Sequence, residues 1–210
     1  MEYLDIYNDN HEFLGVCEKK LTHKLGLWHD VFTCQIISPK RKTAVFQIKN
    51  HLHNGLHDKD LVEITVGGHY QSGEKIEDGV REIKEETGLD ISYDQLIDLG
   101  VRQTCTTVNP EYIIKEFQHI HLLPIDNELS EYTGFDEDEI SDVIEFQIDD
   151  LISLLLNKKK KIYGKTKNKK IMVTLDNFVK SYLTGDKLYL RLLIAAKRYL
   201  AGEDVELIMW

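Results

Sequence analysis

Apolar residues recur along the chain with two different spacings, and each spacing predicts one kind of element. Short stretches rich in β-branched and aromatic residues, separated by turn-forming Asn, Asp, Gly and Pro, are typical of β-strands. These stretches are residues 3–7, 13–17, 31–37, 44–49, 62–66, 96–106, 113–123, 143–148 and 171–175. The third and fourth stretches are joined by a turn at residues 38–41 and are expected to form a hairpin.

Apolar positions three or four residues apart predict three helices. The inward positions of the first helix are Ile76, Val80, Ile83 and Thr87. Gly88 follows it and can adopt the left-handed conformation that ends many helices. Residues 149–157 form a short second helix, and residues 188–200 form an amphipathic third helix that Gly202 terminates.

The composition is that of a globular protein with one domain and an appendage. The 210 residues are 42% hydrophobic and 30% charged, which allows a substantial core. The net charge of −10 argues against a broad basic face, so no nucleic-acid partner is expected. No apolar run approaches the ~20 residues that cross a bilayer, so no membrane partner is expected either.

The cysteines and the chain ends bear on location and assembly. The cysteines are scattered and odd in number, as is typical of reduced thiols: Cys17, Cys34 and Cys105. Residues 1–10 contain no apolar targeting segment, so a cytoplasmic location is expected. The lysine-rich stretch 158–170 is expected to be a solvated hairpin or loop. The apolar tail 205–210 packs either on the body or on a second copy in a homodimer.

The first predicted helix carries an unusual concentration of negative charge. Glu82, Glu85 and Glu86 fall within one turn, at offsets of three and four residues. Like charges so placed destabilise a bare helix by about 0.2–0.5 kcal/mol per pair. A divalent cation between them offsets this repulsion, and hard oxygen ligands suit Mg²⁺ or Mn²⁺. Arg81 can hold one of the carboxylates by a two-pronged hydrogen bond.

The segment before this helix is rich in glycine. Gly67, Gly68 and Gly73 allow sharp turns and a close approach of the backbone to a bound phosphate. Glu74 lies at the junction of loop and helix, where a carboxylate favours the helix N-terminus. Lys49 ends the fourth predicted strand and is placed to contact substrate phosphate.

The stretch 67–89 resembles the Nudix box, the signature of Mg²⁺-dependent hydrolases that cut diphosphates linked to another moiety. The box reads G-x5-E-x7-R-E-U-x-E-E-x-G-U, where U is a bulky aliphatic residue. Residues 81–89, REIKEETGL, match its second half without a mismatch, and residues 68–74 match its first half. Six residues instead of seven separate Glu74 from Arg81, which leaves the role of Glu74 open.

The resemblance implies a fold and a domain organisation. The Nudix fold is an α/β/α sandwich with a mixed β-sheet, here followed by a C-terminal helical extension. We expect residues 1–157 to form the Nudix hydrolase domain and residues 158–210 to pack on it as the extension. The expected partner is a small-molecule diphosphate substrate. The expected cofactor is Mg²⁺, with Mn²⁺ as the alternative.

The resemblance also implies roles for individual residues. The expected metal ligands are Glu82, Glu85, Glu86 and Glu139. The expected catalytic residues are Glu82, Arg81 and Glu139. A box glutamate or Glu139 would deprotonate the attacking water, and Arg81 would fix a box carboxylate. Glu137 is the reserve for Glu139. The expected substrate-binding residues are Gly67, Gly68, His69 and Lys49.

The opening of the chain resembles the isopentenyl-diphosphate-isomerase-like branch of the superfamily, in which a strand pair and an H…GLWH segment precede the box. In those isomerases two histidines at the spacing of His23 and His29 join a histidine near the box, here His69, to bind a metal. Three neutral imidazoles suit Zn²⁺ or Mn²⁺. In the alternative, His23 and His29 are hydrogen-bonded structural residues and His69 lines the substrate loop. Other histidines are expected to be solvated: His51, His53 and His57.

Three functions remain open on the sequence alone. The first is hydrolysis of the diphosphate linkage of a nucleoside diphosphate joined to another moiety. The second is isomerisation of isopentenyl diphosphate. The cysteine that those isomerases place before the Gly-His pair is absent, because Gly67 and Val66 stand there, and their later glutamate has only a loose counterpart in residues 112–116. The third is a non-catalytic nucleotide-binding module, which the intact box glutamates disfavour.

Overall fold

The computed structural model describes residues 1–50, 60–136 and 138–209. The strands in these ranges are β1 (Tyr3–Tyr7), β2 (Phe13–Glu18), β3 (Trp28–Ser38), β4 (Thr43–Lys49), β5 (Leu61–Glu63), β6 (Val66–His69), β7 (Ile97–Asn109), β8 (Tyr112–Pro124), β9 (Ile140–Gln147), β10 (Ile162–Thr166) and β11 (Lys170–Val173). The α-helices are α1 (Lys19–Leu25), α2 (Val80–Thr87), α3 (Ile148–Leu155), α4 (Lys180–Leu183) and α5 (Leu188–Leu200). None of these described helices is long and apolar enough to cross a membrane.

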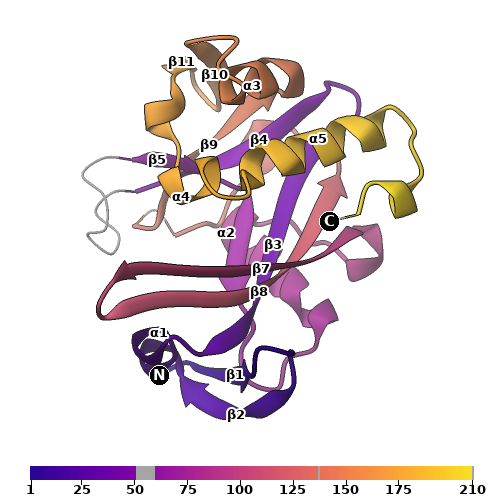
Figure 1. The fold of residues 1–210 in the computed structure, drawn as a ribbon. Coiled ribbons are helices and arrows are strands. Elements are labelled where there is room, and N and C mark those ends of the chain that lie inside the picture. The colour runs from indigo at the N-terminus through magenta and orange to yellow at the C-terminus, as the bar shows by residue number, and fades with distance from the viewer. Residues whose placement is uncertain (51–59, 137, 210) are drawn as a thin grey trace.

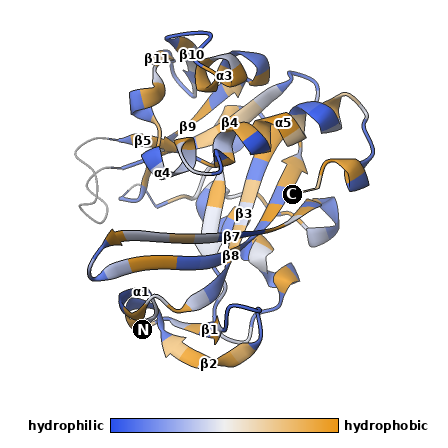
Figure 2. Ribbon diagram, viewed as in Figure 1, coloured by the Kyte–Doolittle hydropathy of each residue, from blue (hydrophilic) through white to orange (hydrophobic). Residues whose placement is uncertain are grey.

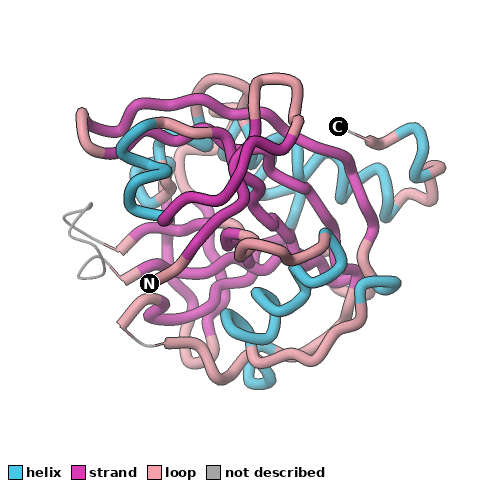
Figure 3. The backbone as a smooth tube through the Cα atoms, turned by 90° about the horizontal axis from the view of Figure 1, so that it is seen from below, coloured by secondary structure: helices cyan, strands magenta, loops and turns pink. Residues whose placement is uncertain are grey.

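The described strands form one continuous mixed sheet with the main path β11-β10-β9-β4-β3-β1-β2. The central strand β3 pairs with β1, β4 and β6 in antiparallel fashion and with β8 in parallel. β7 and β8 form a long antiparallel hairpin whose tip extends to the side of the body, close to α1 (Figure 1). The view from below shows helices on both sides of the strands (Figure 3).

Side chains that alternate along the central strands fill two separate cores, one on each face of the sheet. On one face, Phe32 and Cys34 of β3 pack in the same cluster as Ile83 of α2. On the other face, the core contains residues of β4, β9, α3 and α5: Ala44, Phe46, Ile144, Phe146, Leu151, Leu154, Leu192 and Leu193. Apolar and polar segments alternate along α5 because its inner positions join this core (Figure 2). The α/β/α sandwich with a mixed sheet and a C-terminal helical extension is confirmed.

The predicted helix 188–200 is confirmed as α5. The predicted strand 62–66 is wrong as a single element, because β5 pairs with β4 whereas β6 pairs with β3. Thr65 lies between them, and its hydroxyl accepts the Ile36 N–H at 3.0 Å and donates to the Val45 carbonyl. The hydroxyl thus takes the place of sheet pairing where the chain changes partner.

The box helix begins differently from the single continuous helix that the apolar spacing predicts. Its first residues form a 3-10 turn, Ile76–Gly79, and the α-helix α2 follows directly. A Cβ at Gly79 would overlap the Phe32 ring, so glycine lets the start of the helix lie against β3. The predicted end is confirmed, since Gly88 has a φ of 74° and caps α2.

The C-terminal region is joined to the same sheet and core. The lysine-rich stretch contains β10 and ends where β11 begins, and these two strands form a hairpin. The expectation of a fully solvated stretch is wrong, because β10 pairs with β9 and buries alternate residues. In the tail, Ile208 is 4% exposed and belongs to the core beneath α5. The tail therefore packs on the body of this chain. The domain boundary at residue 157 and the homodimer stay predictions.

Candidate active site

A cavity of about 1050 Å³ opens where α2, β6, α1 and the tip of the β7–β8 hairpin meet. One wall is acidic and consists of Glu82, Glu85, Glu86, Asp136 and Glu139. A basic wall comes from α1 and contributes Lys19, Lys20, His23 and Lys24, and Glu2 and Glu111 also line the cavity. The apolar spacing did not predict α1, which ends at Gly26 with a φ of 60°. The lining of the cavity thus combines carboxylates, several of them from α2, with ammonium groups from α1.

Gly68 lies directly against the carboxylate of Glu82. A Cβ at position 68 would overlap both carboxylate oxygens, so glycine is what lets the Glu82 carboxylate lie against β6 in this position. The Arg81 guanidinium donates to Glu82 at 2.9 Å. Burial raises the pKa of Glu82, and the positive charge of Arg81 acts in the opposite direction. The first box glycine and the first helix glutamate are therefore one structural unit.

Glu86 is the most buried of the three helix glutamates, with 10% of its side chain exposed against 12% for Glu82 and 55% for Glu85. Its carboxylate accepts the Gly67 N–H at 2.9 Å and lies 3.4 Å from the Lys49 ammonium. Burial raises the pKa of Glu86 to about 8, although both of these partners favour the charged form. A divalent cation at this position would stabilise the ionised carboxylate.

Lys49 joins two carboxylates that are distant in the sequence. Its Nζ lies 2.7 Å from Glu139 Oε1 and 3.4 Å from Glu86 Oε1. Burial by itself would lower the pKa of Lys49, but the charges of Glu63, Glu139 and Glu86 in its ionised form outweigh it and raise the pKa. The ammonium group therefore stays charged and neutralises part of the acidic wall.

Arg81 holds three carboxylates at once. Its Nε and Nη2 donate to the two oxygens of Glu74 at 2.9 and 3.2 Å. Nη2 also donates to Glu82, and Nη1 donates to Glu85 at 2.7 Å. The structure thus gives Glu74 a definite place: it anchors Arg81 from the loop side and does not line the acidic wall.

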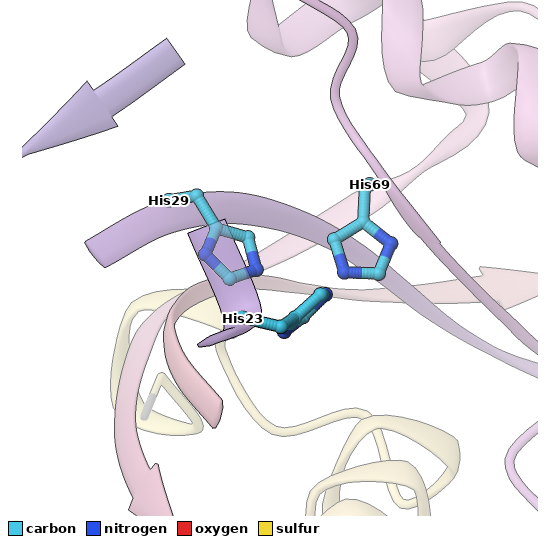
Figure 4. Close-up of side chains that lie close together, drawn as sticks. All are labelled: His23, His29 and His69. Carbon is cyan, nitrogen blue, oxygen red and sulfur yellow. The ribbon is translucent and has the colours of Figure 1, made fainter. Parts of the chain in front are cut away.

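His23, His29 and His69 lie together (Figure 4). The rings of His29 and His69 are stacked, and the ring of His23 is edge-on to both. One nitrogen from each lies within 4.8 Å of the others. Among the described residues, both nitrogens of His23 and the Nε2 atoms of His29 and His69 are buried without a hydrogen-bond partner. Burial lowers the pKa of all three histidines, that of His29 to about 4. They are therefore neutral, the form that binds metals.

Glu116 is a residue that the sequence did not place at this cluster. Its Oε1 lies 4.0 Å from His29 Nε2, and its Oε2 accepts the Gln118 side-chain N–H at 2.7 Å. Burial raises the pKa of Glu116 to about 7. The signal in the sequence that could have found Glu116 is the loose match of segment 112–116 to the isomerases. The structure places this segment at the cluster, since Tyr112 stacks on His23 with ring centroids 4.5 Å apart. The unpartnered nitrogens disfavour a purely hydrogen-bonded role for the three histidines.

The donor groups divide into two chemically different sets. The acidic wall offers carboxylate oxygens, and its raised pKa values and the Gly68 contact fit a hard cation such as Mg²⁺ or Mn²⁺. The histidine cluster offers neutral nitrogens, which fit Zn²⁺ or Mn²⁺. The reserve carboxylate and the three loop histidines of the sequence analysis lie outside the described residues: Glu137, His51, His53 and His57.

Comparison with known proteins assigns the chain to a family. Residues 27–167, more than half of the chain, match the NUDIX domain family, so the chain belongs to this family. An uncharacterized Nudix hydrolase of Clostridium acetobutylicum is 33% identical over 159 residues, which cover 75% of each chain. The crystal structure of DR0079 from Deinococcus radiodurans has a TM-score of 0.51 and covers 75% of this chain and 90% of that one. At 19% identity this second likeness shows the fold alone.

Family membership defines the class of enzyme. The chain is a hydrolase that acts on diphosphate bonds in small molecules, and enzymes of this class generally use divalent metals such as Mg²⁺. The family match covers the Nudix domain as a whole and does not single out the isomerase-like branch. The substrate, the ion and the individual residue roles are therefore matters for proposal.

Proposed function

We propose that this protein is a Mg²⁺-dependent pyrophosphohydrolase that cleaves the diphosphate linkage of a nucleoside diphosphate joined to another moiety. The observation that carries the proposal is the pair of buried carboxylates, Glu82 and Glu86, each in contact with the backbone of the glycine segment. Burial disfavours their charged forms, which a divalent cation would restore. Such a pair contributes little to stability by itself and is better explained by metal binding.

The proposed metal ligands are Glu82, Glu85, Glu86 and Glu139. When bound there, Mg²⁺ supplies charge neutralisation on the phosphate oxygens of the substrate. Arg81 keeps Glu82 and Glu85 in position through the hydrogen bonds described above. Either Glu139 or a box glutamate removes a proton from the attacking water, because a carboxylate within hydrogen-bond reach of that water can act as its base.

The size of the cavity supports a substrate that extends well beyond the diphosphate. Pockets for small molecules commonly measure about 300–1,000 Å³, and this one has about 1050 Å³. Its basic wall is oriented by ion pairs of Lys19 with Glu2 at 2.9 Å and Lys24 with Glu111 at 2.7 Å. We assign this wall to the polar or anionic moiety at the far end of the substrate, and Gly67, Gly68, His69 and Lys49 to the diphosphate end.

The products identify the bond that is cut. With Mg²⁺ and ¹⁸O-labelled water, a nucleotide sugar or a dinucleoside diphosphate is expected to yield two phosphomonoesters, one of them carrying ¹⁸O. Phosphorus NMR measures both the products and the isotope shift. Inorganic phosphate should appear only after a phosphatase is added. Release of pyrophosphate from a nucleoside triphosphate, with no cleavage of these two substrates, would contradict the proposed substrate class.

A second candidate function is isomerisation of isopentenyl diphosphate, which the cluster of His23, His29, His69 and Glu116 favours. Moving a double bond requires one group to add a proton and another to remove one. Gly67 and Val66 stand before the Gly-His pair and can do neither, and Cys34 is buried in the core beneath α2. We therefore place this function second.

No deuterium is expected to enter isopentenyl diphosphate in heavy water with Mg²⁺ or Mn²⁺. The physical reason is the missing proton donor at position 67, since glycine has no side chain to supply one. Mass spectrometry of the recovered substrate is the measurement. Incorporation that persists in the Cys34→Ala and Cys105→Ala variants would show that another residue is the acid, and the hydrolase assignment would have to be revised.

A further inference from the structure

A third group of potential metal ligands, besides the acidic wall and the histidine cluster, lies outside the active-site cavity. Asp30 Oδ1 is 2.8 Å from His11 Nε2 and 2.9 Å from His119 Nε2, and one ligand atom from each residue lies within 4.8 Å of the others. Asp30 and His119 have 9% and 10% of their side chains exposed, whereas His11 has 34%. Two buried groups on the sheet thus face one accessible histidine.

The three residues come from different elements that tertiary structure brings together. Asp30 is on β3 and His119 on β8, which pair in parallel. His11 lies in the turn between β1 and β2, and its φ of 62° is uncommon for a residue other than glycine. Its ring stacks on Phe117 with centroids 4.1 Å apart, which holds Nε2 toward Asp30. The stacking and the contact with Asp30 orient the imidazole in this direction.

A cavity borders two of the three residues and gives a further ligand access to them. It measures about 420 Å³ and is lined by His11 and Asp30 together with Tyr7, Tyr70 and Gln71, whereas His119 lies outside its lining. A tetrahedral ion with bonds of about 2.0–2.1 Å would place its ligand atoms about 3.3 Å apart. The separations of 2.8 and 2.9 Å from Asp30 Oδ1 are hydrogen-bond distances, and each has to open by about 0.4–0.5 Å to admit an ion. The exposed turn that carries His11 can supply the first of these movements.

We propose that His11, Asp30 and His119 form a binding site for a divalent transition-metal ion of the Zn²⁺ type. Two imidazole nitrogens and one carboxylate oxygen suit such an ion better than Mg²⁺, which prefers oxygen ligands. Each imidazole would carry its proton on Nδ1 and present Nε2 to the ion. The ion would fasten the β1–β2 hairpin to the body. That hairpin otherwise pairs with β3 at two positions, Ile6↔His29 and Tyr7↔Trp28.

The test counts bound Zn²⁺ in the full-length protein by equilibrium dialysis against buffered micromolar Zn²⁺, with millimolar Mg²⁺ present to occupy the acidic wall. Wild type is expected to bind one equivalent more than His11→Gln. The matched control Asn10→Ala changes an exposed neighbour in the same turn and should bind as wild type does. Saturating Zn²⁺ should raise the Tm of wild type by about 5–10 °C more than that of His11→Gln.

His119→Gln should lose the same equivalent and show no additive loss with His11→Gln, because both remove one site. Equal Zn²⁺ stoichiometry in wild type and His11→Gln would overturn the proposal, as would binding that appears only at millimolar Zn²⁺. If the buried variant His119→Gln does not fold, the Zn²⁺ stoichiometry of the exposed variant His11→Gln still tests the proposal. The histidine cluster at the active site contributes equally to wild type and His11→Gln, so it cancels in the comparison.

Discussion

Replacing Glu86 by glutamine is expected to lower turnover by at least ~10²-fold, on the scale of a lost preorganised electrostatic contact. Glutamine keeps the size of the side chain and a similar helix propensity, but it removes a charged metal ligand. Its amide oxygen can still accept the Gly67 N–H that Glu86 accepts now. The loss should therefore fall on catalysis and leave the fold intact.

The metal-free Glu86→Gln protein is expected to be as stable as wild type or more stable near neutral pH. Burial raises the pKa of Glu86 from 4.5 to about 8. As the pH rises through this window, the unfolded chain loses the proton while the folded chain keeps it, so the carboxyl group destabilises the fold increasingly. The glutamine variant lacks this cost. Its advantage should be absent below pH 4.5 and should grow as the pH rises toward 8.

Steady-state hydrolysis with Mg²⁺ measures the loss of turnover. Thermal melts of the metal-free protein between pH 4.5 and 8 measure the change in stability. Glu77→Gln is the matched control, because Glu77 is exposed at the start of the same helical segment and lies outside the acidic wall. It should change neither turnover nor the pH dependence of the Tm. Near wild-type turnover in Glu86→Gln would show that the carboxylates of the box helix do not take part in the mechanism.

Gly68→Ala is expected to lower turnover by about 10²-fold with a smaller effect on stability. The added Cβ would overlap the Glu82 carboxylate, which is the far end of a flexible side chain and can move aside. The fold survives this movement, but the carboxylate leaves the position that the proposed metal site requires. Kinetics with saturating Mg²⁺ and a thermal melt separate the two consequences.

Two comparisons make the Gly68 prediction specific. Once Glu82→Gln is present, adding Gly68→Ala should cost little further activity, because both changes act through the same carboxylate. Gly67→Ala is the control for stability, since a Cβ there would meet its nearest neighbours, Ile64 and Phe32, at ordinary distances of 3.5 and 3.9 Å. Fully additive losses of activity for Gly68→Ala and Glu82→Gln would show that the glycine acts in another way.

The sequence alone was informative where a feature depends on neighbours along the chain. The end of α2 at Gly88 and the span of α5 follow from local spacing and turn residues. The box motif likewise identified the family, because its glutamates and glycines are close in sequence and each is required by local geometry. The expected roles of these residues stay predictions until the variants are measured.

Local patterns were less informative where one stretch of the chain pairs with two different strands. The stretch 62–66 has the apolar character of one strand, but it crosses from β4 to β3 and Thr65 bridges the crossing. The helix α1 was missed because the chain around His23 shows no clear apolar period. Buried polar residues such as Glu116 gave only a weak signal, since their sequence spacing does not show which side chains they meet.

What the sequence determined by itself is the family, the sandwich of helices and strands, and the helix glutamates that suit a divalent cation. Tertiary structure alone decided which distant groups surround them. It brought Lys49 against Glu139 and Gly68 against Glu82, it gathered His23, His29 and His69, and it joined His11 to Asp30 and His119. The physical reason is that helix and strand periods describe one element at a time. Distances between elements depend on the packing of the sheet, which no short stretch of residues encodes.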